Sequence, residues 1–326
     1  MADGTAGESF LEQKLNAQRL RSHESRQMKI PIQFDIMVTT KCNGSCKGCI
    51  QEATYRPVVG GTQQFLQALE HHVSRFYNRG GRRIIITGGE PLLELPLVLA
   101  VLKVLRAYDD LDVKALYTNG SRLLDNEEGK TVAALLANAA LGSVNLSVHH
   151  HDDRINNGLI GLPIKASTRD ITAELNRISL PFRFNLVLQR GGIATVDDLL
   201  AYVETAAKLG ARDVYVREMA GYTFDQPMCA SNRDVLGYTR SHKVSAKKLA
   251  DALSERVEVR QVASKREQFR DKWEIQYSHL PTGCAFSLAS NVIGSESREG
   301  MPYLVLMPDA RLYRGWLGME DQLEEI

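Results

Sequence analysis

Residues 31–49 read PIQFDIMVTTKCNGSCKGC, an apolar strand-like run followed at once by a loop with three cysteines. Cys42, Cys46 and Cys49 have a C-x3-C-x2-C spacing, so this short loop carries three of the chain's five cysteines. Thiolates are the usual ligands of iron–sulfur clusters, and a four-iron cluster normally takes four of them. Three thiolates on one loop therefore favour a cluster in which one iron binds a ligand that is not protein.

The cysteine loop has two other interpretations, a structural zinc site and a disulfide. A structural zinc site takes four nitrogen or sulfur ligands, usually as two pairs, and the sequence has no second C-x2-C or H-x3-H pair. A disulfide fits poorly, because the cysteine count is odd and no secretion signal is present. We expect Gly44 and Gly48 to let the backbone fold closely around a cluster, with Lys41 and Lys47 offsetting its negative charge.

A second motif follows the next apolar run, residues 83–87, and consists of Gly88, Gly89, Glu90 and Pro91. In this order and spacing, the two motifs resemble the signature of the radical S-adenosylmethionine (SAM) superfamily. The resemblance implies a [4Fe-4S] cluster on the three cysteines and SAM as the second cofactor, with the SAM amino group bound at the Gly-Gly-Glu-Pro turn. Carboxylate and carbonyl oxygens accept hydrogen bonds from an ammonium group, and glycines permit close approach of the backbone.

Gly48 departs from the pattern of that superfamily. The residue before the third cysteine is usually aromatic or bulky in the family, and it touches the adenine of SAM. With glycine at this position, we expect either another neighbour for the adenine or a different packing of the cysteine loop.

The chain has 326 residues, of which 44% are hydrophobic and 24% are charged, and its formal net charge is +1. This composition suits one large α/β domain, alone or with a small appendage, and implies no general attraction to nucleic acid or membranes. The polar residues 1–26 lack the apolar core of a signal peptide, and no apolar run is long enough to span a bilayer. Unpaired cysteines and an oxygen-sensitive cluster predict a reducing, cytoplasmic location.

Strand and helix patterns alternate through most of the chain. The strand-like runs end near Val38, Thr87, Thr118, Val148, Leu188 and Arg217. The helical patterns cover residues 63–78, 95–108, 126–140, 168–178 and 196–209. This alternation predicts an α/β fold with a parallel sheet and right-handed crossovers. The resemblance implies that six such units form a partial (β/α)6 TIM-like barrel, and residues 184–219 resemble the molybdenum-cofactor and peptide-modifying branch of the superfamily.

We expect three parts: a polar, helical N-terminal segment (residues 1–30), the barrel (31–220) and a small α+β C-terminal extension (221–326). Within the extension, residues 243–253 look helical, and two apolar runs flank Pro308-Asp309-Ala310 and predict a β-hairpin that covers the barrel. Many family members have a cysteine-rich extension there. This chain has only Cys229 and Cys284 in its last third, too few to ligate a second cluster fully.

Barrels of this kind carry their functional residues at the carboxyl ends of the strands. By their places in the barrel, Asn119, Ser147 and Asn185 are expected to contact SAM. We expect His149 and Arg217 to bind or act on the substrate or SAM.

His149 is the first of three consecutive histidines. Neighbouring side chains on a strand point to opposite faces of the sheet. At most one or two of them can therefore face the interior. The alternative is a set of loop histidines hydrogen-bonded to Asp152 or Asp153, and we favour this alternative for His150 and His151.

Arg190 and Arg217 suit a carboxylate, which a guanidinium binds through two parallel hydrogen bonds. Their alternative role is a structural ion pair, for instance with Glu218. Cys284 and Cys229 also have two interpretations. Either cysteine is a small buried hydrophobic residue, or it donates a hydrogen atom to a substrate radical, as the resemblance to radical SAM epimerases implies.

The resemblance implies an enzyme that cleaves SAM reductively and abstracts hydrogen from its substrate through a 5′-deoxyadenosyl radical. The electron would come from an external donor such as flavodoxin or ferredoxin. About thirty residues precede the first strand, too few for the peptide-binding domain of many peptide-modifying members. With no second cluster available, this favours a small polar metabolite in specialised biosynthesis, the type of reaction being open. One alternative is an enzyme that modifies a peptide substrate. The other is a non-catalytic iron–sulfur or zinc protein.

Overall fold

The structure is a computed structural model that describes residues 33–49, 61–162, 166–219, 235–267, 270–290, 303–314 and 322–323. Residues 31–326 form one compact unit. The expected N-terminal segment (1–30) and Cys229 lie outside the described residues. The division of the compact unit into a barrel (31–220) and an extension (221–326) stays a prediction.

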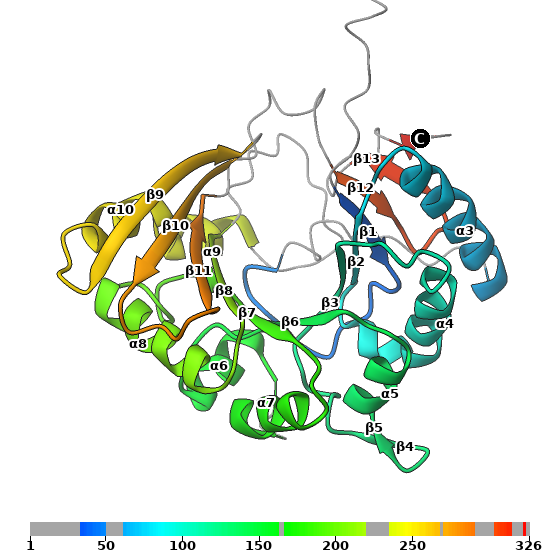
Figure 1. The fold of residues 1–326 in the computed structure, drawn as a ribbon, viewed down its shortest axis with the longest axis horizontal. Coiled ribbons are helices and arrows are strands. Elements are labelled where there is room, and N and C mark those ends of the chain that lie inside the picture. The colour runs from blue at the N-terminus through cyan, green and yellow to red at the C-terminus, as the bar shows by residue number, and fades with distance from the viewer. Residues whose placement is uncertain are drawn as a thin grey trace, which may run out of the picture. The chain divides into compact units, whose positions relative to one another are not determined.

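One large sheet organises the compact unit (Figure 1). Within the described residues it has twelve strands in the order β14-β13-β12-β1-β2-β3-β6-β7-β8-β11-β10-β9. Their bounds are β1 Gln33–Met37, β2 Arg83–Thr87, β3 Val113–Thr118, β6 Ser143–Ser147, β7 Phe182–Leu188, β8 Asp213–Glu218, β9 Val259–Glu267, β10 Arg270–Tyr277, β11 Ala285–Ala289, β12 Tyr303–Leu306, β13 Leu312–Arg314 and β14 Gln322–Leu323. The six strands from β1 to β8 in this order are parallel neighbours, so the predicted α/β fold with six parallel units is confirmed.

Strands from the C-terminal part extend this sheet at both edges. β11 pairs parallel with β8, and β10 and β9 follow it as antiparallel neighbours. At the other edge, β12 pairs parallel with β1, and β13 forms with β12 the hairpin expected from the sequence. The hairpin is therefore joined edge-on to the first barrel strand, whereas β9, β10 and β11 were not expected.

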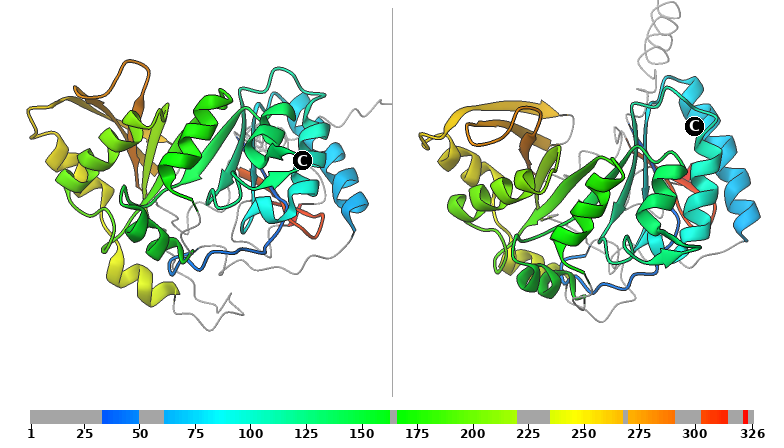
Figure 2. Two further views of the ribbon diagram at one scale, coloured as in Figure 1. Left: turned by 90° about the horizontal axis from the view of Figure 1, so that it is seen from below. Right: turned by 60° about the horizontal axis from the view of Figure 1, so that its bottom comes forward.

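Helices lie on the outer side of the curved sheet, as Figure 1 and Figure 2 show for α3, α4, α5, α7 and α8. The helix bounds are α3 Thr62–Asn78, α4 Leu95–Leu105, α5 Val132–Asn138, α6 Asp153–Ile160, α7 Thr168–Arg177, α8 Val196–Lys208, α9 Val235–His242 and α10 Ala246–Leu253, and a short 3-10 helix, η1, covers Pro91–Glu94. In the part of the chain that the structure describes, no helix has the length and apolar character needed to cross a membrane.

The helix expected over residues 126–140 is wrong in its first part. A two-stranded ribbon, β4 (Asn126–Glu127) and β5 (Lys130–Thr131), precedes the helix there. Its turn residues Glu128 and Gly129 have φ values of 53° and 78°, the backbone of a tight hairpin turn. The side chain of Thr131 then caps α5, which is why the helix begins at Val132.

The two faces of the parallel strands differ in chemistry. The outer face is apolar, since residues such as Phe34, Ile86, Leu116 and Phe184 are buried in one large cluster with the helices. Side chains alternate along a strand, so the intervening residues face the inner side. These include Asp35, Thr87, Tyr117, Asn145, Ser147, Arg183, Asn185, Asp213, Tyr215 and Arg217. The sheet therefore presents a largely polar inner face, which suits a site inside the barrel.

Candidate active site

Three thiols lie on the loop that leaves the carboxyl end of β1, where such barrels form their sites. Cys42 is exposed, Cys46 and Cys49 are half-buried, and none of the three is in a disulfide. The Gly44 N–H points at Cys42 Sγ, 3.3 Å away. Hydrogen bonds to sulfur are a feature of cluster ligation, so both the residues and their surroundings suit a cluster.

The end of α6 holds the middle of the cysteine loop. The Ser45 N–H donates to the carbonyl oxygen of Ile160 at 2.7 Å, and Cys46 Sγ lies 3.5 Å from the same oxygen. Gly161 follows with a φ of 70°, and a Cβ at this position would lie 2.0 Å from Ser45 Oγ. Only glycine satisfies both the left-handed backbone and this contact. Gly161 was not predicted from the sequence, although a glycine that ends a short helical pattern is a usable signal.

The turn after β2 packs backbone against backbone on the start of the cysteine loop. The Gly89 N–H donates to Thr39 O, and the Glu90 N–H donates to Lys41 O, each at 2.8 Å. A Cβ on Gly88 would lie 2.6 Å from Thr39 O, and one on Gly89 would lie 2.2 Å from Lys41 O. Side chains are excluded at both glycines, so the two sequence motifs form one continuous backbone structure.

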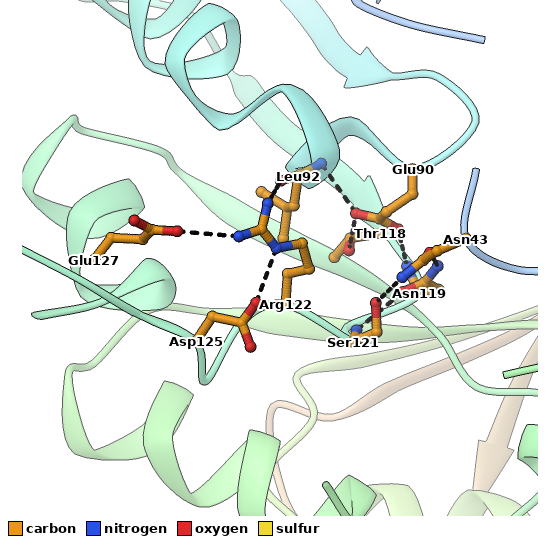
Figure 3. Close-up of polar contacts among 9 residues, drawn as sticks. All are labelled: Asn43, Glu90, Leu92, Thr118, Asn119, Ser121, Arg122, Asp125 and Glu127. Atoms are coloured by element: carbon orange, nitrogen blue, oxygen red, sulfur yellow. Dashed lines mark hydrogen bonds and ion pairs between the residues drawn. The ribbon is translucent and has the colours of Figure 1, made fainter. Parts of the chain in front are cut away.

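Glu90 is fully buried, and its carboxylate joins the ends of β2 and β3 (Figure 3). Oε1 accepts hydrogen bonds from Thr118 Oγ1 at 2.7 Å and from the Leu92 N–H at 3.1 Å. Oε2 accepts one from the Asn119 N–H at 2.8 Å. Burial raises the pKa of Glu90, and these three donors oppose the shift. The Glu90 carboxylate therefore holds the end of β3 against the turn that follows β2.

Asn119 connects the end of β3 with the cysteine loop (Figure 3). Its Nδ2 donates to Asn43 Oδ1 at 2.9 Å, and its Oδ1 accepts the Ser121 N–H at 2.9 Å. Asn43 Nδ2 in turn donates to Ser121 Oγ at 2.9 Å. Asn43 and Ser121 were not singled out in the sequence, because their role depends on two loops that are far apart along the chain.

A pocket lies between the ends of β3 and β6 and the helices α6 and α7. Asn119, Ser121, Ser147, Asn156 and Thr168 supply its polar lining. The structure thus brings together Asn119 and Ser147, two residues expected from the sequence to contact SAM. Asn119 also connects this pocket directly with the cysteine loop.

His149 is a buried inner residue rather than an exposed loop histidine. Its ring Nδ1 accepts the backbone N–H of Val187 at 3.2 Å, and the backbone N–H of His149 donates to Asn156 Oδ1 at 2.7 Å. Burial, with a smaller effect from the Arg217 charge, lowers the pKa of His149 to about 4. The ring is therefore neutral near pH 7, and because Nδ1 accepts, its proton is on Nε2. The alternative with Asp152 and Asp153 does not describe this residue.

Glu218, next to Arg217 at the end of β8, contacts the start of α10 and Lys243. Its Oε1 accepts the Ala246 N–H at the start of α10 at 2.7 Å, and its Oε2 lies 3.7 Å from Lys243 Nζ. Arg217 is on the inner face in register with Val187, near His149. Val187 thus links the two positions, because it pairs with Arg217 in the sheet and donates its N–H to His149.

Cys284 lies at the opposite end of the strands from the cysteine loop. It directly precedes β11, whose first residue Ala285 pairs in parallel with Asp213, the first residue of β8. Burial raises the pKa of the Cys284 thiol, which disfavours the thiolate. The expectation that a glycine-containing loop places Cys284 near the barrel mouth is therefore wrong. The reason is that β11 extends the parallel sheet, which the sequence did not indicate.

Three polar atoms on the inner face of β6 and β7 are buried and have no hydrogen-bond partner among the described residues. They are Asn145 Nδ2, Arg183 Nε and Asn185 Oδ1. Arg183 has contacts through its other nitrogens, donating to the Tyr117 hydroxyl at 2.6 Å and lying 3.7 Å from Asp213 Oδ2. Asn145 and Arg183 are side by side in the strand register.

Within the described ranges, no three histidine, cysteine or acidic side chains converge on a position for a single metal ion. Cys42, Cys46 and Cys49 share one loop and stay the predicted ligands of a cluster.

A protein family and several known proteins are similar to this chain in sequence. The model of the radical SAM superfamily matches residues 36–223. A GTP 3′,8-cyclase of Ectopseudomonas mendocina is 30% identical over 215 residues, which cover 60% of this chain and 58% of that protein. A GTP 3′,8-cyclase of Chlorobaculum tepidum is 28% identical over 226 residues, which cover 68% and 61%. The chain thus matches about three-fifths of the length of these two relatives.

Solved structures with a similar fold include Streptococcus suis SuiB bound to the precursor peptide SuiA, with a TM-score of 0.58 and 14% identity. The alignment covers 100% of this chain and 70% of that one. SuiB bound to S-adenosylmethionine has a TM-score of 0.56 and 13% identity, covering 97% and 69%. At such identities the likeness concerns the fold alone. The family match over residues 36–223 shows that the chain belongs to the radical SAM superfamily, whose enzymes use a [4Fe-4S] cluster and SAM.

Proposed function

We propose that this radical SAM enzyme abstracts hydrogen from a small polar metabolite, in a specialised biosynthetic pathway in the reducing cytoplasm. The observation that carries the proposal is the direct backbone contact between the cysteine loop and the Gly-Gly-Glu turn. Two hydrogen bonds of 2.8 Å hold these motifs together at the carboxyl end of the sheet, so a cluster and a cofactor bound to them would be neighbours.

In this proposal Cys42, Cys46 and Cys49 hold the cluster. Backbone carbonyls at Gly88 and Gly89 would receive the SAM amino group, because the Glu90 carboxylate already accepts three hydrogen bonds. Pro91 fixes the start of η1 and so the direction of this turn. When bound, the cofactors supply one-electron cleavage of SAM and a carbon radical that takes hydrogen from the substrate. An external flavodoxin or ferredoxin would supply the electron.

Asn119, Ser147 and Asn185 are proposed as the remaining SAM contacts. Asn119 and Ser147 line the pocket beside the cysteine loop. Asn185 is in register with Ser147 on the neighbouring strand, so the two side chains are next to each other on the inner face. Hydroxyl and amide groups at these positions suit the hydroxyls of a ribose and the oxygens of a carboxylate.

The inner face of the sheet favours a polar substrate. Buried polar atoms in proteins nearly always have partners, and Asn145 Nδ2, Arg183 Nε and Asn185 Oδ1 have none among the described residues. Asn185 is in register with Ser147 near the carboxyl ends of the strands, so a polar ligand bound there could supply the donor that Asn185 Oδ1 lacks.

His149 and Arg217 are proposed to bind a carbonyl or carboxylate group of the substrate or of SAM. The neutral ring of His149 offers an N–H donor, since Nδ1 is occupied by the Val187 N–H. The guanidinium of Arg217 can supply two parallel hydrogen-bond donors. In this arrangement the two residues orient the substrate and do not transfer a proton.

The curated relatives also favour a small molecule, because their names describe cyclases of GTP. A modified peptide is the second candidate. It is favoured by the fold neighbour SuiB, whose structure was solved with a precursor peptide. At 14% identity this neighbour shares the fold and carries less weight than the relatives at about 30%.

Deuterium transfer distinguishes these candidates. The anaerobically reconstituted protein is incubated with SAM, reductant and deuterated candidate substrates, including GTP, other small metabolites and peptides. We expect deuterium from a small polar metabolite in 5′-deoxyadenosine, and none with a Cys46→Ser variant. Transfer from a peptide alone would support the second candidate instead. A protein that forms no 5′-deoxyadenosine would be a non-catalytic metal-binding protein.

A further inference from the structure

Gly48, between the second and third cysteines of the loop, faces two side chains from distant parts of the chain. A Cβ at this position would lie 3.2 Å from Met219 Sδ and 3.5 Å from Tyr238 Cδ1. Met219 directly follows β8, and Tyr238 belongs to α9. The missing side chain at position 48 therefore leaves the space that Met219 and Tyr238 occupy.

Tyr238 is held firmly at this place. Its hydroxyl donates to Gln189 Oε1 at 3.0 Å, and its ring stacks on His242, with 4.0 Å between the ring centroids and 14° between the planes. The Arg190 N–H donates to His242 O at 2.9 Å, and Gln189 forms a β-bridge with Lys243. The end of α9 is thus fastened to the end of β7, and the half-buried Tyr238 ring lies over the cysteine loop.

A base must lie near this loop when SAM is bound. SAM carries its adenine one ribose away from the sulfonium, and its methionine end meets the cluster iron next to Cys42, Cys46 and Cys49. Bases stack on aromatic rings, and one such contact contributes roughly 1–3 kcal/mol. A tyrosine that is fixed on one side by another ring, and close to the turn before Cys49, has the chemistry of a stacking surface.

We propose that Tyr238, backed by His242 and flanked by Met219, forms the surface on which the adenine of SAM is stacked. An aromatic ring from α9 thereby takes the place of a side chain that Gly48 does not supply. The inference rests on the proposed function, since it requires SAM to bind at the cysteine loop. It also gives α9 a role in cofactor binding, although α9 lies about 190 residues after the cysteines.

Equilibrium binding to the reconstituted protein, without reductant, tests this role. Three ligands separate the parts of the cofactor: SAM, 5′-deoxyadenosine, which has the base and the ribose, and methionine, which has neither. For Tyr238→Leu we expect the dissociation constants of SAM and 5′-deoxyadenosine to rise about tenfold or more, and that of methionine to stay within about twofold. Tyr238→Phe keeps the ring and should stay within about threefold for all three ligands.

A Tyr108→Leu variant is the matched control, because Tyr108 packs against Tyr77 after α4 on the outer side of the sheet. If Tyr238→Leu fails to fold, Tyr238→Trp still decides the question. Its added indole should keep SAM binding, and its emission should fall when 5′-deoxyadenosine binds. Unchanged emission at saturating 5′-deoxyadenosine would overturn the proposal.

These measurements distinguish an error in the role of Tyr238 from an error in the proposed function. If the unmodified protein takes up about four irons and binds SAM, and Tyr238→Leu binds SAM equally well, the role of Tyr238 is wrong and the proposed function stands. If the unmodified protein takes up no iron or binds no SAM, the proposed function itself is wrong.

Discussion

Glu90 accepts three hydrogen bonds while its side chain is fully buried. In Glu90→Gln, one end of the side chain becomes an amide N–H2 group. Whichever way this amide turns, it faces the backbone N–H of either Leu92 or Asn119, and that N–H loses its acceptor. A buried donor without a partner costs about 1–3 kcal/mol. We therefore expect the free energy of unfolding to fall by about this amount in denaturant titrations.

The control for this substitution is Glu94→Gln on the same turn. Glu94 forms an ion pair with Lys41 at 2.8 Å, and 71% of the Lys41 side chain is exposed. Exposed pairs contribute at most about 1 kcal/mol, so the control should unfold nearly like the unmodified protein. Equal losses in the two variants would contradict the structural role of Glu90.

His149 makes the stability depend on pH on the acid side. Its pKa is lowered from 6.5 to about 4, so the unfolded state binds the proton more tightly than the folded state. The stabilisation is complete above pH 6.5 and is lost as the pH falls toward 4, by up to about 3 kcal/mol. In His149→Gln this part of the pH dependence should disappear. If the free energy of unfolding falls equally between pH 7 and pH 4.5 in the unmodified protein and in His149→Gln, the contribution of His149 is excluded.

At the scale of elements, the contact between the Gly-Gly turn and the cysteine loop depends on the absence of side chains. A Cβ on Gly89 would lie 2.2 Å from the backbone oxygen of Lys41, so Gly89→Ala forces the two segments apart. Overpacking of this kind costs about 1–3 kcal/mol. We expect a lower melting temperature and less iron retained per chain after reconstitution.

Gly158→Ala is the matched control for Gly89→Ala. Gly158 lies in α6, and a Cβ there would have no heavy atom within 4 Å. Alanine is the better residue within a helix by about 0.5–1 kcal/mol, so this variant should be at least as stable as the unmodified protein. Full iron retention in Gly89→Ala would show that the two motifs tolerate separation.

The sequence indicated the parallel strands well, because they are buried and apolar on one face. It did not indicate β9 and β10. Charged residues such as Asp271 and Lys272 obscured the alternation in β10, where Trp273, Ile275 and Tyr277 are buried. The helix expected over 126–140 failed at Gly129, where a tight turn outweighed the helical pattern of the residues around it.

At the scale of the whole molecule, the spacing of the cysteines and of Gly88-Gly89-Glu90 was enough to predict the motifs, and the structure shows their contact. Contacts between distant segments were not predictable. Asn43 contacts Ser121, and Gly48 lies beside Tyr238, although each pair is far apart in the sequence. The same reason explains the error at Cys284, whose position depends on the pairing of β11 with β8.

Anaerobic reconstitution tests the central claim most directly. The purified chain is supplied with iron and sulfide, its metal content is measured, and SAM and reductant are then added. We expect about four irons per chain and cleavage of SAM to 5′-deoxyadenosine, with both lost in a Cys42→Ser, Cys46→Ser, Cys49→Ser triple variant. Bound zinc in place of iron, with no cleavage of SAM, would contradict it.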